Sequence, residues 1–438
     1  MKTKKITQDK VNVITLGCSK NQVDSENLIA QLEAGKYDVV HDSEQEANIV
    51  VINTCGFIGD AKEESINTIL SYADAKSSGE LEKLYVTGCL SERYKDELAQ
   101  EIPEVDAWFG TLELPALLRK FNVDYRHELL GHRKPVNPGH FAYLKIAEGC
   151  TRTCAFCAIP LMRGTHVSRD MQDIVDEAMF LAQKGIKELI LISQELTFYG
   201  LDLYKERRLP QLLEKLVQVN GIEWIRLHYT YPGKFPLELI DVMAKYPKIC
   251  NYLDIPLQHG NDQVLERMNR NTTVSDARMV IAYARKHIPD IAIRTTFIVG
   301  FPGETEAEFQ DLLDFVQEME FDRVGVFQYS HEEDTRAYVM KDDVPEDVKA
   351  ERASRLMEIQ QEISLRKNIG KVGQVMKVLF DRKEGEYFIG RTEFDSPEVD
   401  NEVLIPADSN FVRVGDFANV KITDAEEFDL YGELYLSR

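Results

Sequence analysis

The stretch EGCTRTCAFC, residues 148–157, carries three cysteines, Cys150, Cys154 and Cys157, directly after a short apolar segment with the pattern of a β-strand. Their spacing is C-x3-C-x2-C, and three thiolates on one short loop can hold three corners of an iron–sulfur cube. No fourth cysteine lies nearby, so one iron would have no protein ligand. Such an open position resembles that of a catalytic metal site, where a ligand is bound and transformed.

A structural zinc site is the alternative interpretation of these cysteines. Zinc sites of this kind usually pair two C-x2-C halves, and this region has only one. His166 is a candidate fourth ligand, but nothing in its spacing supports that role. We therefore favour iron–sulfur chemistry at this loop.

The chain around the cysteine loop alternates strands and helices. Six β/α repeats between Ala142 and about Lys367 predict a partial (β/α)6 barrel of the TIM type over residues 141–369, with its chemistry at the carboxyl ends of the strands. A helix at about residues 350–367 closes this segment. The expected strands are Tyr143–Ala147, Glu188–Ser193, Trp224–Tyr229, Tyr252–Leu257, Ala292–Val299 and Arg323–Tyr329, and the expected helices include Asp173–Gln183 and Glu306–Met319.

Residues 1–130 show the same alternation on a smaller scale. Consecutive strand–helix units imply a parallel sheet with right-handed crossovers, so the fold class is α/β. No G-x-G-x-x-G fingerprint of a dinucleotide site is present. The expected strands are Val11–Leu16, Ile49–Asn53 and Leu84–Thr87, and the expected helices are Val23–Glu33, one from about Ala61, and Glu92–Gln100.

Two further segments complete the predicted organisation. Residues 131–140 (GHRKPVNPGH) are rich in Gly, Pro and His and are typical of a linker. After Gly370 short strands alternate with turns, which predicts a small all-β barrel over residues 370–438. Its expected strands are Val375–Phe380, Tyr387–Thr392, Glu402–Ile405 and Ala418–Thr423.

Three other cysteines, Cys18, Cys55 and Cys89, share one context. Each follows an apolar strand, in VITLGC, VVINTC and YVTGC. The carboxyl ends of neighbouring parallel strands meet at one edge of a sheet, so we expect these thiols to converge into a second three-thiolate site. The alternative is three buried structural thiols, since cysteine is often buried. For Cys250, beside an apolar strand, burial is the favoured interpretation.

Composition limits the remaining possibilities. The 438 residues are 44% hydrophobic and 29% charged, with a net charge of −22 and a pI of about 4.9. No apolar run is long enough to cross a membrane, and Met1–Lys10 lacks the apolar region of a secretory signal, so the expected compartment is the cytoplasm. An odd count of seven cysteines argues against a disulfide framework.

The cysteine patterns resemble a known family. The C-x3-C-x2-C loop is similar to the signature of the radical S-adenosylmethionine (SAM) superfamily. The three upstream cysteines resemble the methylthiotransferase family, whose members combine an N-terminal cluster domain, a radical SAM barrel and a C-terminal TRAM domain. Four segments look like the RimO branch of that family, which modifies an aspartate of ribosomal protein S-twelve: LGCSKNQVDSE (16–26), YLDIPLQH (252–259), FDRVGVFQYS (321–330) and GRTEFDSPEVDN (390–401).

The resemblance implies two 4Fe-4S clusters and SAM as cofactors. The cluster on the C-x3-C-x2-C loop would bind and reductively cleave SAM, and the resulting radical would abstract hydrogen from the aspartate β-carbon. The cluster on Cys18, Cys55 and Cys89 would hold or supply sulfur, and a second SAM would supply the methyl group. A low-potential electron donor such as flavodoxin or ferredoxin is also implied.

Four residues are candidates for SAM contacts by the same resemblance, each with a structural alternative. Phe156 would pack near the adenine, or is a core side chain. Gln194 and Glu195 would face SAM, or cap a strand; Glu195 stands where the branch more often has Asp. Arg294 would pair with the SAM carboxylate, or forms a structural ion pair. A second departure is Asp334, where the branch more often has Gly.

Charge bears on the choice of substrate. From Lys371 to Arg438 the chain has eight Lys and Arg against fifteen Asp and Glu. A domain that holds tRNA is expected to show a basic face, so this balance disfavours a phosphate backbone and favours a basic ribosomal protein. The acidic face is expected to include Asp395, Glu398, Asp400, Asp424, Glu426, Glu427 and Asp429.

Three other hypotheses stay open from the residues alone. The sister MiaB branch attaches a methylthio group to isopentenyladenosine in tRNA. A non-catalytic iron–sulfur electron-transfer protein would also carry cysteine clusters, and a zinc-binding interaction module is the third possibility. The predicted open irons and the barrel argue against the electron-transfer protein, and the zinc-binding module is the weakest of the three.

Overall fold

The structure, a computed structural model, describes residues 9–133, 135–136 and 139–436. Most of the N-terminal stretch considered above (residues 1–8), three residues of the expected linker (134, 137 and 138) and the last two residues lie outside the described part. Within the described part, no helix is both long and apolar enough to cross a membrane.

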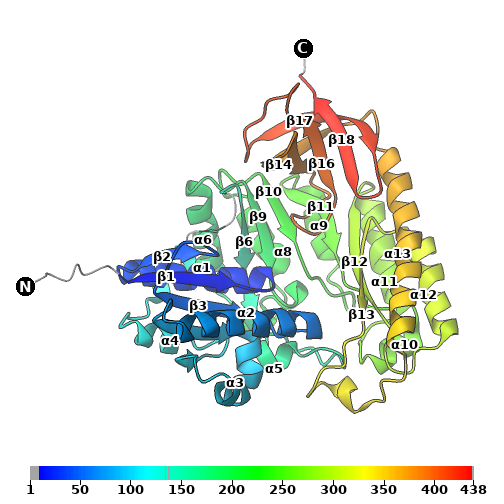
Figure 1. The fold of residues 1–438 in the computed structure, drawn as a ribbon. Helices are drawn as coiled ribbons and strands as arrows, with labels where there is room; N and C mark the ends of the chain where they lie inside the picture. The colour runs from blue at the N-terminus through cyan, green and yellow to red at the C-terminus, as the bar shows by residue number, and fades with distance from the viewer. Residues whose placement is uncertain (1–8, 134, 137–138, 437–438) are drawn as a thin grey trace, which may run out of the picture.

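The N-terminal domain is a five-stranded parallel sheet, as the strand–helix order predicts (Figure 1). Its strands lie in the order β2 (Asp38–His41), β1 (Lys10–Thr15), β3 (Ile49–Thr54), β4 (Lys83–Gly88) and β5 (Ala107–Trp108). Apolar residues of α1 and α4 pack on one face, and those of α2 and α3 pack on the other. The helices are α1 (Ser19–Ala34), α2 (Gly59–Ser77), α3 (Cys89–Glu101) and α4 (Leu114–Lys120).

The edge strands β2 and β5 and the helix α4 were not among the expected elements. β2 has four residues, none of them buried, and β5 has two. Such short edge segments lack the apolar periodicity that marks a strand in sequence. The central strands β1, β3 and β4, which the sequence does predict, carry the buried apolar runs.

The middle domain is a six-stranded parallel sheet with helices around it, which confirms the predicted partial barrel. Spatial neighbours follow chain order: β6 (Phe141–Lys145), β9 (Glu188–Ile192), β10 (Trp224–Leu227), β11 (Ile249–Asp254), β12 (Ala292–Val299) and β13 (Arg323–Gln328). The surrounding helices enclose the largest apolar core of the described chain. They are α6 (Met171–Gln183), α8 (Leu209–Leu216), α9 (Glu238–Lys245), α11 (Val274–His287), α12 (Glu306–Met319) and α13 (Glu346–Ile369).

Short elements fill the connections of this domain. Several of them carry the cysteine loop and its neighbours. They are β7 (Ala147–Glu148), α5 (Ile159–Arg163), β8 (Val167–Ser168), α7 (Leu201–Tyr204) and α10 (Asp262–Arg267), with 3-10 turns at η1 (His127–Gly131), η2 (Leu196–Phe198) and η3 (Arg336–Val339).

Several strand boundaries differ from the expected ones, among them those of β6, β10, β11 and β14. β10 ends at Leu227 and not at Tyr229, because Tyr229 has φ +63°, a conformation that interrupts a strand. β11 begins at Ile249, where Cys250 is fully buried against Trp224 and Leu379. Burial is the interpretation favoured above for Cys250.

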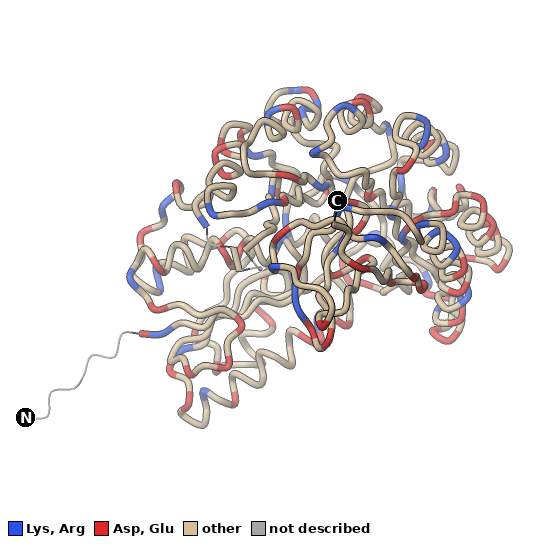
Figure 2. Tube along the Cα trace, turned by 90° about the horizontal axis from the view of Figure 1, so that it is seen from above, with Lys and Arg blue, Asp and Glu red and all other residues tan. Residues whose placement is uncertain are grey.

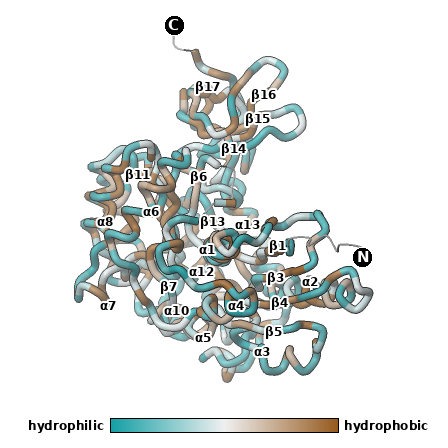
Figure 3. The backbone as a smooth tube through the Cα atoms, turned by 90° about the vertical axis from the view of Figure 1, so that its left-hand side faces the viewer, coloured by the Kyte–Doolittle hydropathy of each residue, from teal (hydrophilic) through white to brown (hydrophobic). Residues whose placement is uncertain are grey.

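The C-terminal domain is a closed five-stranded barrel in the order β14 (Val375–Glu384), β15 (Tyr387–Arg391), β16 (Glu402–Pro406), β18 (Asp429–Leu434) and β17 (Phe417–Ala425). The strand β18 was not expected. It contains Gly432, whose missing side chain lets the backbone of Lys421 and the side chain of Val420 approach, and glycine lowers the strand propensity of the segment. Figures 1 and 3 show this barrel and the N-terminal sheet on different sides of the six-stranded sheet.

Residues 392–401, which we call the plug segment, connect β15 to β16 and enter the amino end of the middle domain. Asp395 binds Arg323, the first residue of β13, at 3.0 Å. Asp400 accepts a hydrogen bond from Tyr252 at 2.7 Å and pairs with Arg294 at 3.3 Å. The C-terminal barrel is therefore anchored at the strand ends opposite to those that precede the cysteine loop.

The described part of the expected linker does not behave as a loose connection. Arg133 is fully buried and pairs with Glu26 of α1 and Glu177 of α6. His140 is buried and lies 2.7 Å from Asp381 of β14. Both side chains have charged partners in other domains, so Arg133 and His140 tie the three domains together.

Candidate functional site

The three N-terminal cysteines lie at the carboxyl ends of three adjacent strands. Cys18 follows β1, Cys55 follows β3 and Cys89 begins α3 directly after β4. Burial raises the pKa of Cys55 and raises that of Cys89 to about 11, and the charge of Cys18 raises both further. The three sulfurs therefore lie within electrostatic reach of one another, as the strand order led us to expect.

Glycine permits the close approach of these loops. Gly17 has φ +91°, and a Cβ atom there would lie 2.7 Å from the Cβ and 2.9 Å from the Sγ of Cys55. Gly88 has φ +101°, and its Cβ would lie 2.5 Å from the carbonyl oxygen of Thr54. Only glycine accepts both the conformation and the contact, so both positions are required for the arrangement of the cysteines.

Asn21 holds the three loops together from α1. Its fully buried side chain donates to the carbonyl oxygens of Leu16 (2.7 Å) and Thr54 (3.0 Å), and its Oδ1 lies 3.8 Å from the Sγ of Cys89. The loop after β3 is fixed separately, because the Ser65 hydroxyl accepts from the backbone N–H of Cys55 (3.0 Å) and donates to its carbonyl (2.8 Å). The thiols are thus presented by a rigid frame.

The C-x3-C-x2-C loop follows β7 and precedes α5. The Cys157 N–H donates to the Cys154 carbonyl at 3.2 Å, and the Cys150 N–H donates to the Gly164 carbonyl at 3.0 Å. Burial raises the pKa of Cys150 to about 11 and that of Cys157 to about 12, and the charge of Cys154 raises both further. The loop therefore gathers its three thiols in one place.

Neither trio has the geometry of a simple metal-ion site. Among the described residues, no three His, Cys, Asp or Glu side chains converge on a position that could hold one metal ion. The His166 ring lies 3.2 Å from the Ser168 hydroxyl and forms no hydrogen bond with a cysteine in the described part of the chain.

Arginines accompany both sets of thiols, and sequence inspection did not identify them. Arg270 donates to the Cys154 Sγ at 3.5 Å, and Arg163 approaches the Cys89 Sγ at 3.3 Å. Arg152, within the cysteine loop, lies with its guanidinium 3.5 Å from the ring centre of Tyr231 and 4.0 Å from that of Phe198. Of these three arginines only Arg152 lies between the cysteines of the loop, and Arg163 and Arg270 carry no such signal in the sequence.

Two of the predicted SAM-contact residues reach the cysteine loop. Gln194 donates to Glu148 at 2.8 Å, and Glu195 accepts from Arg152 at 2.8 and 3.1 Å. The Gln194 Oε1 and the Arg270 Nε are buried without a hydrogen-bond partner in the described structure. A free acceptor and a free donor beside three thiols fit a ligand that carries an ammonium and a carboxylate, as SAM does.

The other two predicted contacts are placed differently. Phe156 packs against Ala155, Met268 and Phe301, so its ring is part of a local apolar cluster next to the loop. Arg294 lies in the amino-terminal half of β12, where it pairs with Asp254 at 3.2 Å and with Asp400 of the plug segment. These are the contacts of the structural ion pair considered as its alternative, and they lie away from the cysteine loop.

The departure at Asp334 also has a local explanation. Asp334 has φ +59°, in the left-handed region that favours glycine. The preceding Glu332 is held by Lys62 (2.7 Å) and Arg93 (3.1 Å) of the N-terminal domain. Aspartate tolerates this conformation better than most residues, so the turn is kept.

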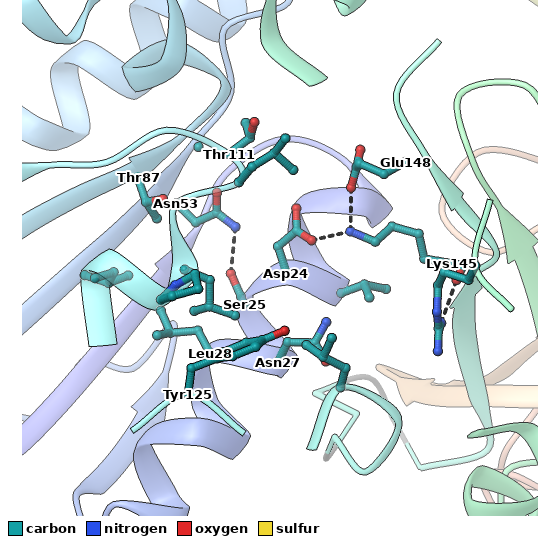
Figure 4. A pocket seen from close by; sticks show the side chains of 18 residues that line it. Asp24, Ser25, Asn27, Leu28, Asn53, Thr87, Thr111, Tyr125, Lys145 and Glu148 are labelled. Atoms are coloured by element: carbon teal, nitrogen blue, oxygen red, sulfur yellow. Dashed lines mark hydrogen bonds and ion pairs between the residues drawn. The ribbon is translucent and has the colours of Figure 1, made fainter. Parts of the chain in front are cut away.

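A cavity of about 300 Å³ adjoins the site between α1, the segment after β5 and β6. Figure 4 shows Lys145 reaching Asp24 on one side and Glu148 on the other, with Asn53, Thr87 and Tyr125 across the cavity. Thr87 precedes the Cys89 loop and Glu148 precedes the Cys150 loop, so this cavity lies beside both sets of thiols.

The exposed residues of the C-terminal barrel are less acidic than the domain's whole amino-acid composition suggests. Asp395 and Asp400 have side chains that are 0% and 1% exposed, so the expectation that they form an acidic face is wrong. Both are used in the ion pairs of the plug segment. In the backbone trace seen from above, Lys and Arg positions lie among Asp and Glu positions (Figure 2). The exposed acidic residues of this domain are Glu384, Glu386, Glu398, Asp408, Asp424, Glu426, Glu427 and Glu433, and the exposed basic ones are Lys377, Arg382, Lys383, Arg413 and Lys421.

Comparison with known families divides the chain into three matches. Residues 10–110 match Uncharacterized protein family UPF0004, residues 144–316 match the radical SAM superfamily, and residues 372–434 match the TRAM domain. These matches agree with the three kinds of domain seen in the fold.

Curated relatives align over nearly the whole chain. A protein of Flavobacterium johnsoniae named ribosomal protein uS12 methylthiotransferase RimO is 58% identical over 99% of this chain and 100% of its own length. Proteins of the same name from Cytophaga hutchinsonii and Bacteroides fragilis are 57% and 53% identical over 99% and 97% of this chain, and over 100% and 99% of their own lengths.

Solved structures support the fold alone. The radical SAM methyltransferase TsrM from Kitasatospora setae is 14% identical, with a TM-score of 0.52 over 74% of this chain and 75% of its own. The cobalamin-dependent SAM radical enzyme OxsB is 12% identical, with a TM-score of 0.54 over 80% of this chain and 56% of its own.

Proposed function

Because the chain belongs to the family of ribosomal protein uS12 methylthiotransferases (RimO), we propose that it attaches a methylthio group to the β-carbon of an aspartate in ribosomal protein uS12. It is an enzyme of the transferase class with a radical SAM domain. The observation that carries the proposal is the separation of six thiols into two trios, one at the N-terminal sheet and one on the radical SAM loop.

We assign one 4Fe-4S cluster to each trio. Cys150, Cys154 and Cys157 would hold the cluster that binds SAM, and Cys18, Cys55 and Cys89 would hold the second. The bound cluster and SAM together supply reductive cleavage and a radical that removes hydrogen. Thiols must lose their protons to bind iron, and the raised pKa values of Cys89 and Cys157 mean that cluster binding releases protons at neutral pH.

The surrounding side chains orient the ligand and the loop. Arg270 places a positive charge beside the Cys154 sulfur, where it would also face a cluster held by this loop. Glu195 holds Arg152 between two aromatic rings, so the cysteine loop has one position. With SAM bound, the free oxygen of Gln194 would accept from the SAM ammonium, and the free Nε of Arg270 would donate to the SAM carboxylate. Phe156 provides apolar surface for the adenine, whereas Arg294 acts in the structural ion pair described above.

The partners follow from the same family membership. Ribosomal protein uS12 is the substrate, and its location places the reaction in the cytoplasm. The exposed acidic residues of the C-terminal barrel support a basic protein partner over tRNA, so nucleic acid contact is not the primary interaction. A low-potential donor such as flavodoxin or ferredoxin supplies electrons. Methylthiolation of tRNA and simple electron transfer are not favoured by the relatives.

The decisive experiment is an anaerobic reaction of the iron-loaded enzyme with SAM, sulfide, a reductant and purified uS12. We expect a mass increase of one methylthio group on an aspartate of uS12, located by peptide mass spectrometry. A parallel reaction with tRNA in place of uS12 is expected to give no methylthio nucleoside. Modification of tRNA but not of uS12 would overturn the proposal.

A further inference from the structure

A single buried arginine connects the two cysteine sites. Arg163, at the end of α5, is 3% exposed. Its Nε lies 3.3 Å from the Sγ of Cys89, and its Nη2 donates to the Oδ1 of Asn21. Its Nη1 donates to Asp24 at 2.5 Å and lies 3.4 Å from Glu148. All three guanidinium nitrogens thus have partners.

These partners come from the chain on both sides of the site. Asn21 and Asp24 belong to α1, which begins directly after Cys18, and Cys89 begins α3. Glu148 lies two residues before Cys150, and α5 begins two residues after Cys157. A side chain carried by the radical SAM loop therefore touches the frame of the N-terminal trio.

The charges around Arg163 are balanced before any thiolate is counted. Lys145 pairs with Glu148 at 2.7 Å and with Asp24, as Figure 4 shows. Arg163 and Lys145 provide two positive charges, and Asp24 and Glu148 provide two negative ones. The Nε of Arg163 remains directed at the Cys89 sulfur, so a cluster bound there would face a fixed positive charge at contact distance.

Reduction of a cluster adds negative charge, and a buried positive charge close by stabilises the reduced form. We propose that Arg163 is a positioning residue that fixes Cys89 against the radical SAM loop and raises the reduction potential of the cluster on Cys18, Cys55 and Cys89. This inference rests on the proposed function, because it presupposes that cluster. Through Arg163, the reduction potential of the N-terminal cluster would depend on how the segment that carries the radical SAM cysteines packs against the N-terminal domain.

The test isolates the N-terminal cluster. In a background variant with Cys150, Cys154 and Cys157 replaced by Ala, the reconstituted protein is titrated with reductant and monitored by electron paramagnetic resonance. We expect Arg163→Gln to shift the midpoint potential to more negative values, because a positive charge is removed. Asp24→Asn is expected to shift it in the opposite direction, because the charge of Arg163 is then less compensated.

Arg169→Gln is the matched control. Arg169 lines the cavity of Figure 4, as Asp24, Lys145 and Glu148 do, and it pairs with Glu177 but forms no hydrogen bond with a described cysteine. We expect its midpoint to stay close to that of the background protein. A shift equal to that of Arg163→Gln would overturn the inference, because the effect would then reflect the charge of the region and not the contact with Cys89.

The remaining outcomes separate this inference from the proposed function. If the background protein holds no cluster, the proposed function fails. If it holds one and Arg163→Gln leaves the midpoint unchanged, only the role of Arg163 fails. If Arg163→Gln does not retain its cluster, Asp24→Asn decides: a positive shift supports the inference, and an unchanged or negative one overturns it.

Discussion

Glu188 and Arg226 form an ion pair with neither side chain exposed, and the Arg226 Nε lies 2.8 Å from the Glu188 Oε1. Arg226 also donates to the carbonyl oxygens of Glu393 (2.7 Å) and Thr392 (3.3 Å) in the plug segment. Arg391 of β15 lies beside the second oxygen of Glu188, without the geometry of a directed hydrogen bond. The Glu188 carboxylate, at the start of β9, therefore neutralises Arg226 of the middle domain and Arg391 of the C-terminal barrel.

Loss of that carboxylate should loosen the C-terminal barrel. Glu188→Gln removes the negative charge and leaves two buried guanidinium groups without full compensation, so we expect a loss of about 3 kcal/mol in stability. Calorimetric unfolding, with limited proteolysis to detect release of the barrel, measures this. The control is Lys377→Ala, which breaks the half-exposed pair with Glu223 at the same interface and should cost less than about 1 kcal/mol. Equal losses would contradict the prediction.

The two cysteine trios should be separable by substitution. We expect Cys89→Ala to halve the iron content and abolish uS12 modification while reductive SAM cleavage continues, because the radical SAM loop is intact. Cys154→Ala should abolish both reactions. Iron analysis and chromatography of 5′-deoxyadenosine measure the outcomes. Cys250→Ala is the control, since this buried thiol lies outside both trios and should leave both reactions unchanged. Full uS12 modification by the Cys89 variant would refute the assignment.

Recognition of a basic partner should depend on exposed acids of the C-terminal barrel. We expect the double variant Glu426→Lys and Glu427→Lys to weaken uS12 binding on the order of tenfold at low salt, with a smaller effect at high salt, because screening weakens surface charges. Binding can be followed by calorimetric titration. Glu80→Lys in the N-terminal domain changes the charge of another exposed site. If it weakens binding as strongly, the overall charge and not this barrel steers the partner.

Lys371 gives a pH-dependent prediction. Burial lowers its pKa from an ordinary value of about 10.4 to about 8, and the charge of Arg323 adds to this effect. Between these values the unfolded chain binds more protons than the folded one, so the contribution of Lys371 to stability rises with pH across that window. Lys371→Met should therefore raise stability by up to about 3 kcal/mol at pH 7, and this gain should shrink towards pH 10. Thermal unfolding at both pH values measures it. A gain independent of pH would count against a titrating Lys371.

The sequence allowed the main layout to be predicted because that layout depends on local patterns. Apolar runs mark β1, β3 and β4, and parallel strands place Cys18, Cys55 and Cys89 at one edge without knowledge of any distant contact. The helix α12 was predicted at its observed bounds from its amphipathic pattern, and in the structure a capping box between Thr305 and Glu308 fixes where it begins.

The contacts that could not be predicted join residues far apart in the chain. Arg163 meets Asn21 across 142 positions, and Arg323 meets Asp395 across 72. A charge count over the last domain includes Asp395 and Asp400. It cannot show that Arg323 and Arg294 pair with these carboxylates in the interior. For the same reason Arg133 appeared to belong to a linker, although two buried carboxylates hold it.

The plug segment sets the barrel and the cysteine loop at opposite ends of the same strands. β6 has five residues, which corresponds to roughly 17 Å of strand. A partner that binds the barrel and is modified beside the cysteines must span at least this length of strand. A free amino acid or a very short peptide therefore cannot contact both the barrel and the cysteines. The distance between the C-terminal barrel and the cysteines would thus select partners of macromolecular size.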